Sequence, residues 1–170
     1  MRKKYSFIIF CISLITSLSV PGQARDEQRI SSVGAVFTKD ISVAPLGEAW
    51  REPSRSDGSP GLVWGDVVTN GHGQIQLMLR NQALRYCASF GARLPSQREY
   101  ERLARYLGMG SRAGFETEVL PNLYFDSKYW SSEVDRNNRY YGVFFNAKSG
   151  KAYPSYNGSV REAVRCVVGG

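Results

Sequence analysis

The stretch that decides the fold reads GARLPSQREYERLARYLG and covers residues 91–108. Ser96 and Glu99 have the spacing of a capping box, in which each side chain accepts a hydrogen bond from the other residue's backbone. An apolar stripe at helical spacing then follows, made of Tyr100, Leu103, Ala104 and Leu107. The sequence therefore predicts a short amphipathic helix that begins after Ser96, ends at Gly108 and packs against another element.

Another short amphipathic helix is predicted just before this one, from Asn81 to Phe90. Its apolar positions, at helical spacing, are Ala83, Leu84, Cys87 and Phe90. Asn81 is the expected N-cap residue and Gly91 ends the pattern. In the helix after Ser96, charged residues are expected to cover the outer face: Arg98, Glu99, Glu101, Arg102 and Arg105.

Short runs of β-branched and aromatic residues surround the two helices. One strand is predicted over 61–68, before the helices, and the runs after them are 128–132, 140–146, 151–153 and 163–168. Turn residues separate the later runs, which favours an antiparallel meander. Strands before and after a helical pair indicate an α+β fold, with two short helices packed on a small antiparallel sheet.

The N-terminal 24 residues have the pattern of an export signal. Three basic residues precede a 14-residue apolar run over 7–20, and Gly22 and Ala24 place small residues at −3 and −1. A membrane-spanning helix needs about 20 apolar residues, so we expect a signal peptide over 1–24 and no membrane anchor in the mature chain. Export to the periplasm, the cell surface or the medium is the predicted localisation.

Two segments are predicted to follow the leader. Residues 25–47 form a weakly patterned N-terminal lead-in, in which Val33–Phe37 alternates like an edge strand. Residues 48–170 form the folded domain.

Composition and charge restrict the class of protein. Of the 170 residues, 42% are hydrophobic and 22% charged, which fits a globular protein and excludes a disordered tail, a collagen-like fibre and a membrane bundle. The net charge is +7, and three of the 22 basic residues lie in the leader, leaving 19 basic against 15 acidic residues, or +4. This mild excess is not typical of a nucleic-acid-binding protein.

Removal of the leader leaves two cysteines, Cys87 and Cys166. An even pair in an exported protein predicts one disulfide, which would join the first helix to the last strand. The alternative is a reactive or metal-binding thiol pair, although the sequence contains no CxxC motif or Cys/His cluster that would favour it.

Five short motifs occur in order along the chain: GLVW at 61–64, ALRYC at 83–87, GARLPS at 91–96, YWSS at 129–132 and VRCV at 164–167. Together they resemble the bacterial exported-protein family named after the C-terminal domain of collagen-like adhesins, the Lcl C-terminal domain. The resemblance implies a C-type-lectin-like fold over residues 48–170, similar to that of the sulfatase-modifying, formylglycine-generating enzymes. It does not imply one function, because this fold has many.

The departures from the families that share this fold narrow the expected chemistry. The formylglycine-generating enzymes need an active-site cysteine pair, whereas both cysteines here are expected in the disulfide. The related iron-dependent sulfoxide synthases use three histidines, and this chain has one. Calcium-dependent lectins use a Glu-Pro-Asn or Gln-Pro-Asp loop followed by Trp-Asn-Asp. The corresponding stretches here are Leu120-Pro121-Asn122 and Trp130-Ser131-Ser132. We therefore expect no metal and no cofactor.

Catalysis has little support in the residues themselves. His72, the single histidine, lies in Asn-Gly-His-Gly and is expected to be a solvated turn residue. Glu133 and Asp135 lie two apart near a turn, where solvated acids are expected more often than a glycosidase pair. An enzyme of unfamiliar type is therefore the least favoured prediction, and catalytic residues are expected to be absent.

Binding has more support, because positive charge is concentrated in two segments. Residues 80–105 carry six arginines against two glutamates, and residues 128–170 carry seven basic against three acidic residues. The candidate ligand-binding residues are Arg136, Arg139, Tyr140, Lys148, Lys151 and Tyr153. Aromatic faces beside cationic donors suit sulfated or carboxylated glycans and anionic envelope polymers. The alternative is that alternate aromatics are core residues and the charges only solubilise the hairpin turns.

The sequence thus predicts an exported, non-catalytic recognition module that binds a surface glycan or an anionic polymer. The alternative is a structural envelope component that binds an envelope protein and no small ligand. Nucleic acid is not an expected partner.

Overall fold

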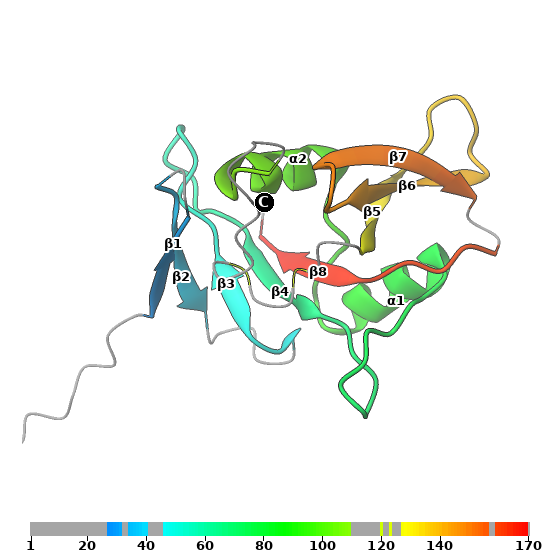
Figure 1. Cartoon of the computed structure of the whole chain (residues 1–170), viewed down its shortest axis with the longest axis horizontal. Coiled ribbons are helices and arrows are strands. Elements are labelled where there is room, and N and C mark those ends of the chain that lie inside the picture. The colour runs from blue at the N-terminus through cyan, green and yellow to red at the C-terminus, as the bar shows by residue number, and fades with distance from the viewer. Residues whose placement is uncertain are drawn as a thin grey trace, which may run out of the picture.

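The computed structural model describes residues 27–31, 34–40, 46–109, 120, 123, 127–156 and 159–169. The predicted signal peptide lies outside these residues, as do Pro121 and Asn122. The fold is α+β, as predicted, but its strands form two antiparallel sheets instead of one (Figure 1). Within the described ranges, no helix has the length and apolar character needed to cross a membrane.

The larger sheet has five strands in the order β1-β2-β3-β4-β8. The strands are β1 (Gln28–Ile30), β2 (Val36–Asp40), β3 (Ala49–Arg51), β4 (Val63–Val67) and β8 (Arg165–Val168). The sequence predicts the last strand in the meander, but it pairs with β4, where Trp64 lies opposite Val167. Figure 1 shows β8 running through the middle of the molecule, beside β4. Its sequence, RCVV, is buried at its first three positions, which suits a strand covered on both faces.

The described part of the lead-in belongs to this sheet. An edge strand is expected at Val33–Phe37, but the observed strand is β2, which begins at Val36 and lies between β1 and β3. Val33 itself lies outside the described residues. Phe37 is fully buried and packs edge-on against Tyr106 at 6.3 Å between ring centroids. Burial of this ring explains why β2 is an inner strand, because its aromatic side chain needs cover from the rest of the core.

The smaller sheet is the predicted meander, with three strands in the order β5-β6-β7. They are β5 (Lys128–Val134), β6 (Tyr141–Asn146) and β7 (Lys151–Tyr156). β7 extends beyond the expected run and contains Pro154, which has no backbone N–H to donate. Such a residue is tolerated because β7 is the outer strand of this sheet.

Helix α2 (Gln97–Tyr106) begins as predicted. The Glu99 backbone N–H donates to Ser96 Oγ at 3.2 Å, and the Ser96 backbone N–H donates to Glu99 Oε2 at 2.7 Å. All four residues of the apolar stripe are buried, and Gly108 follows with φ +66°, a left-handed conformation that favours glycine. The capping box and the stripe together account for the position of this helix.

Helix α1 (Arg80–Ser89) begins earlier than predicted, so Asn81 is not its N-cap. The N-cap is Leu79, whose backbone N–H donates to Gln82 Oε1 at 3.1 Å. The residue before it, Met78, is fixed by the indole of Trp130, whose Nε1 donates to the Met78 carbonyl at 2.7 Å. The start of α1 is therefore fixed by this tertiary contact and not by a local cap residue.

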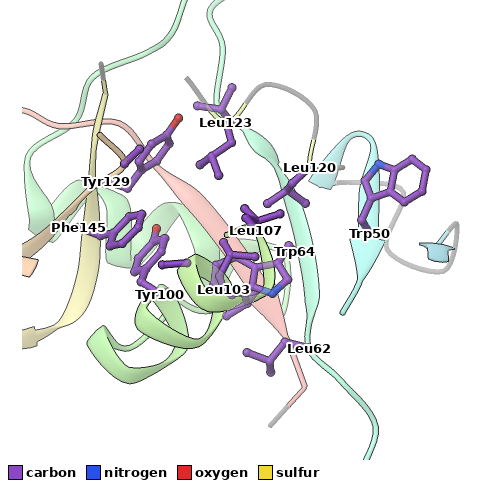
Figure 2. Packing of buried hydrophobic residues seen from close by; sticks show 14 of the residues in the cluster. Trp50, Leu62, Trp64, Tyr100, Leu103, Leu107, Leu120, Leu123, Tyr129 and Phe145 are labelled. Atoms are coloured by element: carbon purple, nitrogen blue, oxygen red, sulfur yellow. The ribbon is translucent and has the colours of Figure 1, made fainter. Parts of the chain in front are cut away.

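The main core lies where α2 meets both sheets. Tyr100 of α2 stacks on Phe145 of β6, with ring centroids 4.7 Å apart and planes 4° apart. Trp64 of β4 and Tyr129 of β5 are further neighbours, at 5.4 and 6.4 Å. Figure 2 shows Tyr100 beside Phe145, with Leu103, Leu107 and Trp64 continuing the cluster. Burial raises the pKa of the Tyr100 hydroxyl well above its usual range, so this phenol stays neutral.

A second cluster lies under α1 and contains the disulfide. Cys87 of α1 bonds to Cys166 of β8, as predicted, with the two Cα atoms 5.5 Å apart. Both sulfur-bearing residues are buried. The disulfide therefore joins the first helix to the five-stranded sheet, and neither cysteine is a free thiol.

Two charged residues of α2 are not on its outer face. Glu99 is buried in the capping box, and Arg102 turns towards Glu52, whose side chain is fully buried. Arg102 Nη2 donates to Glu52 Oε1 at 2.6 Å, and Trp64 Nε1 donates to Glu52 Oε2 at 3.0 Å. A buried carboxylate needs such partners, and this requirement draws the guanidinium inward.

Candidate functional site

A groove of about 460 Å³ lies on the surface where the first turns of α2 meet the three-stranded sheet. We call it the α2 groove. Its polar wall on α2 is formed by Gln97, Arg98 and Glu101. The opposite wall comes from the end of β5 and the following turn, with Glu133, Asp135, Arg136 and Asn137, and the sheet contributes Val143, Ala152, Tyr153 and Pro154. Figure 1 shows α2 beside one end of the sheet that β5, β6 and β7 form.

Glu133 connects the two walls. Its Oε2 accepts a hydrogen bond of 2.6 Å from the backbone N–H of Gln97, the first residue of α2. An anionic acceptor at this end of a helix is stabilised by the unpaired N–H groups and by the helix dipole. Glu133 therefore holds α2 at a fixed distance from β5.

The other two carboxylates of the groove, Glu101 and Asp135, are each also held through one of their two oxygens. Glu101 Oε1 accepts from Gln97 Nε2 at 2.7 Å, and Asp135 Oδ1 accepts from the backbone N–H of Asn137 at 2.7 Å. Among the described residues, the second oxygen of Glu101, Glu133 and Asp135 has no hydrogen-bond donor. Each side chain thus has a fixed position and an oxygen that can still accept.

Two arginines add donors to the same groove. Arg98 on α2 and Arg136 in the turn after β5 are both exposed, and neither has an ion pair with any residue in the described part of the chain. The groove therefore has three carboxylates, two guanidinium groups and two side-chain amides. Both donors and acceptors line it, and its formal charge is close to neutral.

The structure divides the predicted ligand-binding residues among different places. Arg136 and Tyr153 line the α2 groove. Arg139 and Tyr140 lie in the turn before β6, with the Arg139 guanidinium 5.9 Å from the centre of the Tyr140 ring. Lys148 and Lys151 lie beyond the other end of β6, about 17 Å away for a six-residue strand. The six residues therefore do not surround one common space.

The exposed tyrosines also belong to two surfaces. Tyr141 pairs with Tyr156 across β6 and β7, whereas Tyr153 pairs with Phe144. Successive side chains of a strand point to opposite faces, so Tyr153 lies on the face opposite to Tyr141 and Tyr156. It rests on Phe144 at 5.8 Å between ring centroids, and Lys128 Nζ is 5.0 Å from the same phenylalanine ring.

Part of the positive charge predicted for residues 80–105 is used inside the protein. Arg80 donates to the carbonyl oxygens of Ser131 and Ser132, and Arg93 forms two bonds of 2.7 Å with Glu99. Arg102 is paired with Glu52. Three of the six arginines therefore stabilise the fold, so the exposed basic surface is weaker than the sequence indicates.

The single histidine does not line the groove. His72 is exposed in a turn that Asn70 closes, and its backbone N–H donates to Asn70 Oδ1 at 2.9 Å. No group of three or more His, Cys, Asp or Glu side chains suited to a metal ion occurs within the residues that the structure describes.

From the sequence, the acidic residues of the groove are predicted to be solvent-exposed side chains without a role in a site. Glu133 and Asp135 are predicted as turn acids, and Arg98 and Glu101 as part of the outer face of a helix. The four-residue spacing of Gln97 and Glu101 shows that they share a helix face, but only the packing of α2 against β5 makes that face the wall of a groove.

No protein-family model matches this chain, and neither a curated protein nor a solved structure matches it.

Proposed function

We propose that this protein is an exported, non-catalytic recognition module that binds a glycan in the α2 groove, on a scaffold of the C-type-lectin-like kind. One observation carries the proposal: Glu101, Glu133 and Asp135 are each fixed through one oxygen and keep the other available. The motifs that resemble the Lcl C-terminal domain and the predicted signal peptide support the scaffold and the export.

The chemistry of the groove suits hydroxyl groups. A sugar hydroxyl donates one hydrogen bond and accepts others, so it needs fixed acceptors and fixed donors side by side. The carboxylates supply the acceptors, and Arg98, Arg136 and Asn137 supply donors. Because Glu101 and Asp135 are already held, binding orders fewer side chains and loses less of its free energy to entropy.

The size and charge of the groove restrict the ligand further. A volume of about 460 Å³ lies within the usual range for a small-molecule site, which indicates a short saccharide unit. Three carboxylates against two guanidinium groups leave the groove with no excess of positive charge that would attract a polyanion. A neutral glycan is therefore favoured at this groove over a sulfated one or an anionic polymer.

The test is a binding experiment with the mature, oxidised protein on neutral and anionic glycans at about 0.15 M salt and again at higher ionic strength. We expect a neutral glycan to bind with little dependence on salt. Arg98→Ala and Glu101→Gln are each expected to weaken binding about tenfold, the effect of losing a charged hydrogen bond.

Arg105→Ala is the matched control, because Arg105 is exposed on the same helix two turns after Arg98 and does not line the groove. Equal losses in Arg98→Ala and Arg105→Ala would contradict the proposal, as would binding only to polyanions. Absence of binding to every glycan would favour the structural or protein-binding role instead.

A further inference from the structure

A second space, of about 450 Å³, lies beside α1 on a different part of the molecule from the α2 groove. We call it the α1 pocket. Its lining includes Leu77, Met78, Gln82, Arg85, Tyr86 and Arg161. None of them lines the α2 groove, so a ligand in this pocket would be bound independently of the proposed glycan site.

Three hydrogen bonds hold the base of the α1 pocket, and all three involve the backbone of Met78. Met78 and Glu162 form an antiparallel bridge, with N–O distances of 3.0 and 3.1 Å, and the Trp130 indole donates to the Met78 carbonyl. Met78 itself is buried. Because Arg161 immediately precedes Glu162, the bridge places Arg161 opposite Leu79, at the beginning of α1.

The same arrangement brings two guanidinium groups to one side of α1. Arg161 Nη1 donates to Gln82 Oε1 at 3.4 Å, and Arg85 lies three residues after Gln82, on the same helix face. No carboxylate lines the described wall of the pocket, and Arg85 has no ion pair with any residue that the structure describes. This contrasts with the α2 groove, where carboxylates outnumber arginines.

Apolar side chains lie beside these cations. Leu77 is 49% exposed although it is an aliphatic residue, and Met78 lies beneath it. Tyr86 is half-buried, with its ring held edge-on to Phe90 at 5.1 Å between centroids. The pocket therefore combines a cationic rim with a partly exposed apolar wall.

We propose that the α1 pocket binds a small amphiphilic carboxylate, with its head group between Arg85 and Arg161 and its alkyl part against Leu77 and Tyr86. A carboxylate has the planar geometry that guanidinium donors recognise, often through two parallel hydrogen bonds. An alkyl group covering Leu77 removes apolar surface from water. The two parts of the pocket thus select for one molecule that carries both groups.

Octanoate is the probe, added to the mature, oxidised protein and followed by calorimetry, with far-UV circular dichroism to show that the fold is retained. We expect saturable binding of octanoate, weaker binding of octanol and of acetate, and no binding of octylammonium. Arg85→Gln and Arg161→Gln are each expected to weaken octanoate binding about tenfold. Leu77→Ser is expected to weaken octanoate binding and to leave acetate binding unchanged.

Arg105→Gln is the control, because it removes an exposed helix arginine far along the chain from the pocket. Equal binding of octanol and octanoate would overturn the proposal, and so would an equal loss in Arg105→Gln and Arg85→Gln. Competition between octanoate and a bound glycan would also contradict it. Because the α2 groove variants do not touch the α1 pocket, failure of one proposal is distinguishable from failure of the other.

Discussion

Glu99 connects the start of α2 to the segment before it. Its two carboxylate oxygens accept bonds of 2.7 Å from Nη1 and Nη2 of Arg93, and Oε2 also accepts from the Ser96 backbone N–H. Burial raises the pKa of Glu99, but the bonds from Arg93 and Ser96 outweigh this effect and hold the pKa below its ordinary value of 4.5. The residue thus contributes to the cap and to an ion pair at the same time.

This arrangement predicts an acid-dependent loss of stability. A carboxyl group whose pKa is lowered by folding stabilises the protein above its unfolded pKa, and the contribution is lost as the pH falls below about 4.5 and through the lower folded value. Glu99→Gln is expected to lower the free energy of unfolding by about 1 kcal/mol at pH 7 and to have little effect at pH 2.

Urea unfolding at both pH values measures the difference. Glu101→Gln is the matched control, since Glu101 is on the same helix and, among the residues that the structure describes, accepts a hydrogen bond from the Gln97 amide alone. An equal cost of Glu99→Gln at pH 7 and pH 2 would show that the ion pair contributes nothing.

At the scale of elements, the disulfide links α1 to β8 across 79 residues of sequence. We expect the double substitution Cys87→Ala, Cys166→Ala to lower the free energy of unfolding by about 4 kcal/mol, because the unfolded chain regains the entropy of an open loop. Unfolding of the oxidised, the reduced and the substituted protein by urea checks this. A substituted protein as stable as the oxidised one would contradict the expectation.

How far an element can be predicted depends on how local its cause is. α2 follows from Ser96, Glu99 and Gly108, which lie at the two ends of the helix itself, and its position is confirmed. The start of α1 depends on Trp130, some 50 residues away, and its predicted N-cap is wrong. The pairing of β8 with β4 has no local signal at all, because a strand's partner is chosen by packing and not by its own sequence.

The same reasoning applies to the candidate site. Arg136 can be selected from the sequence because it is a cationic residue in a turn, whereas the ring of Tyr153 rests on Phe144, on the face of the sheet away from α2. Glu101 and Glu133 cannot be selected from the sequence, because they form a site only when α2 packs against β5. The basic surface is overestimated from the sequence for a similar reason, since the partners of Arg93 and Arg102 are buried carboxylates.

At the scale of the whole molecule, the lead-in is part of the folded domain, because its strands β1 and β2 complete the five-stranded sheet. The Arg29 guanidinium lies 4.3 Å from the centre of the Trp50 ring, and Asp40 pairs with Arg51 at 2.5 Å. Trp50 is fully buried under this cover.

A chain that begins at Glu48 is therefore expected to be less stable by at least about 3 kcal/mol, the cost of losing one buried aromatic ring such as Phe37. Its tryptophan emission should shift to longer wavelength as Trp50 meets water. A chain that begins at Glu27 keeps both strands and is the control. Equal stability of the two chains would show that β1 and β2 are dispensable.

The disulfide also determines how the molecule responds to tension. When the two ends of the chain are pulled apart, the loop closed by Cys87 and Cys166 cannot extend. The fully stretched chain is therefore shorter by about 270 Å than it would be without the disulfide. Every residue of the α2 groove lies inside this loop, whereas the α1 pocket has Arg85 outside it and Arg161 within it. A force on a tethered molecule would thus pull the α1 pocket apart while the groove stayed inside a covalently closed ring.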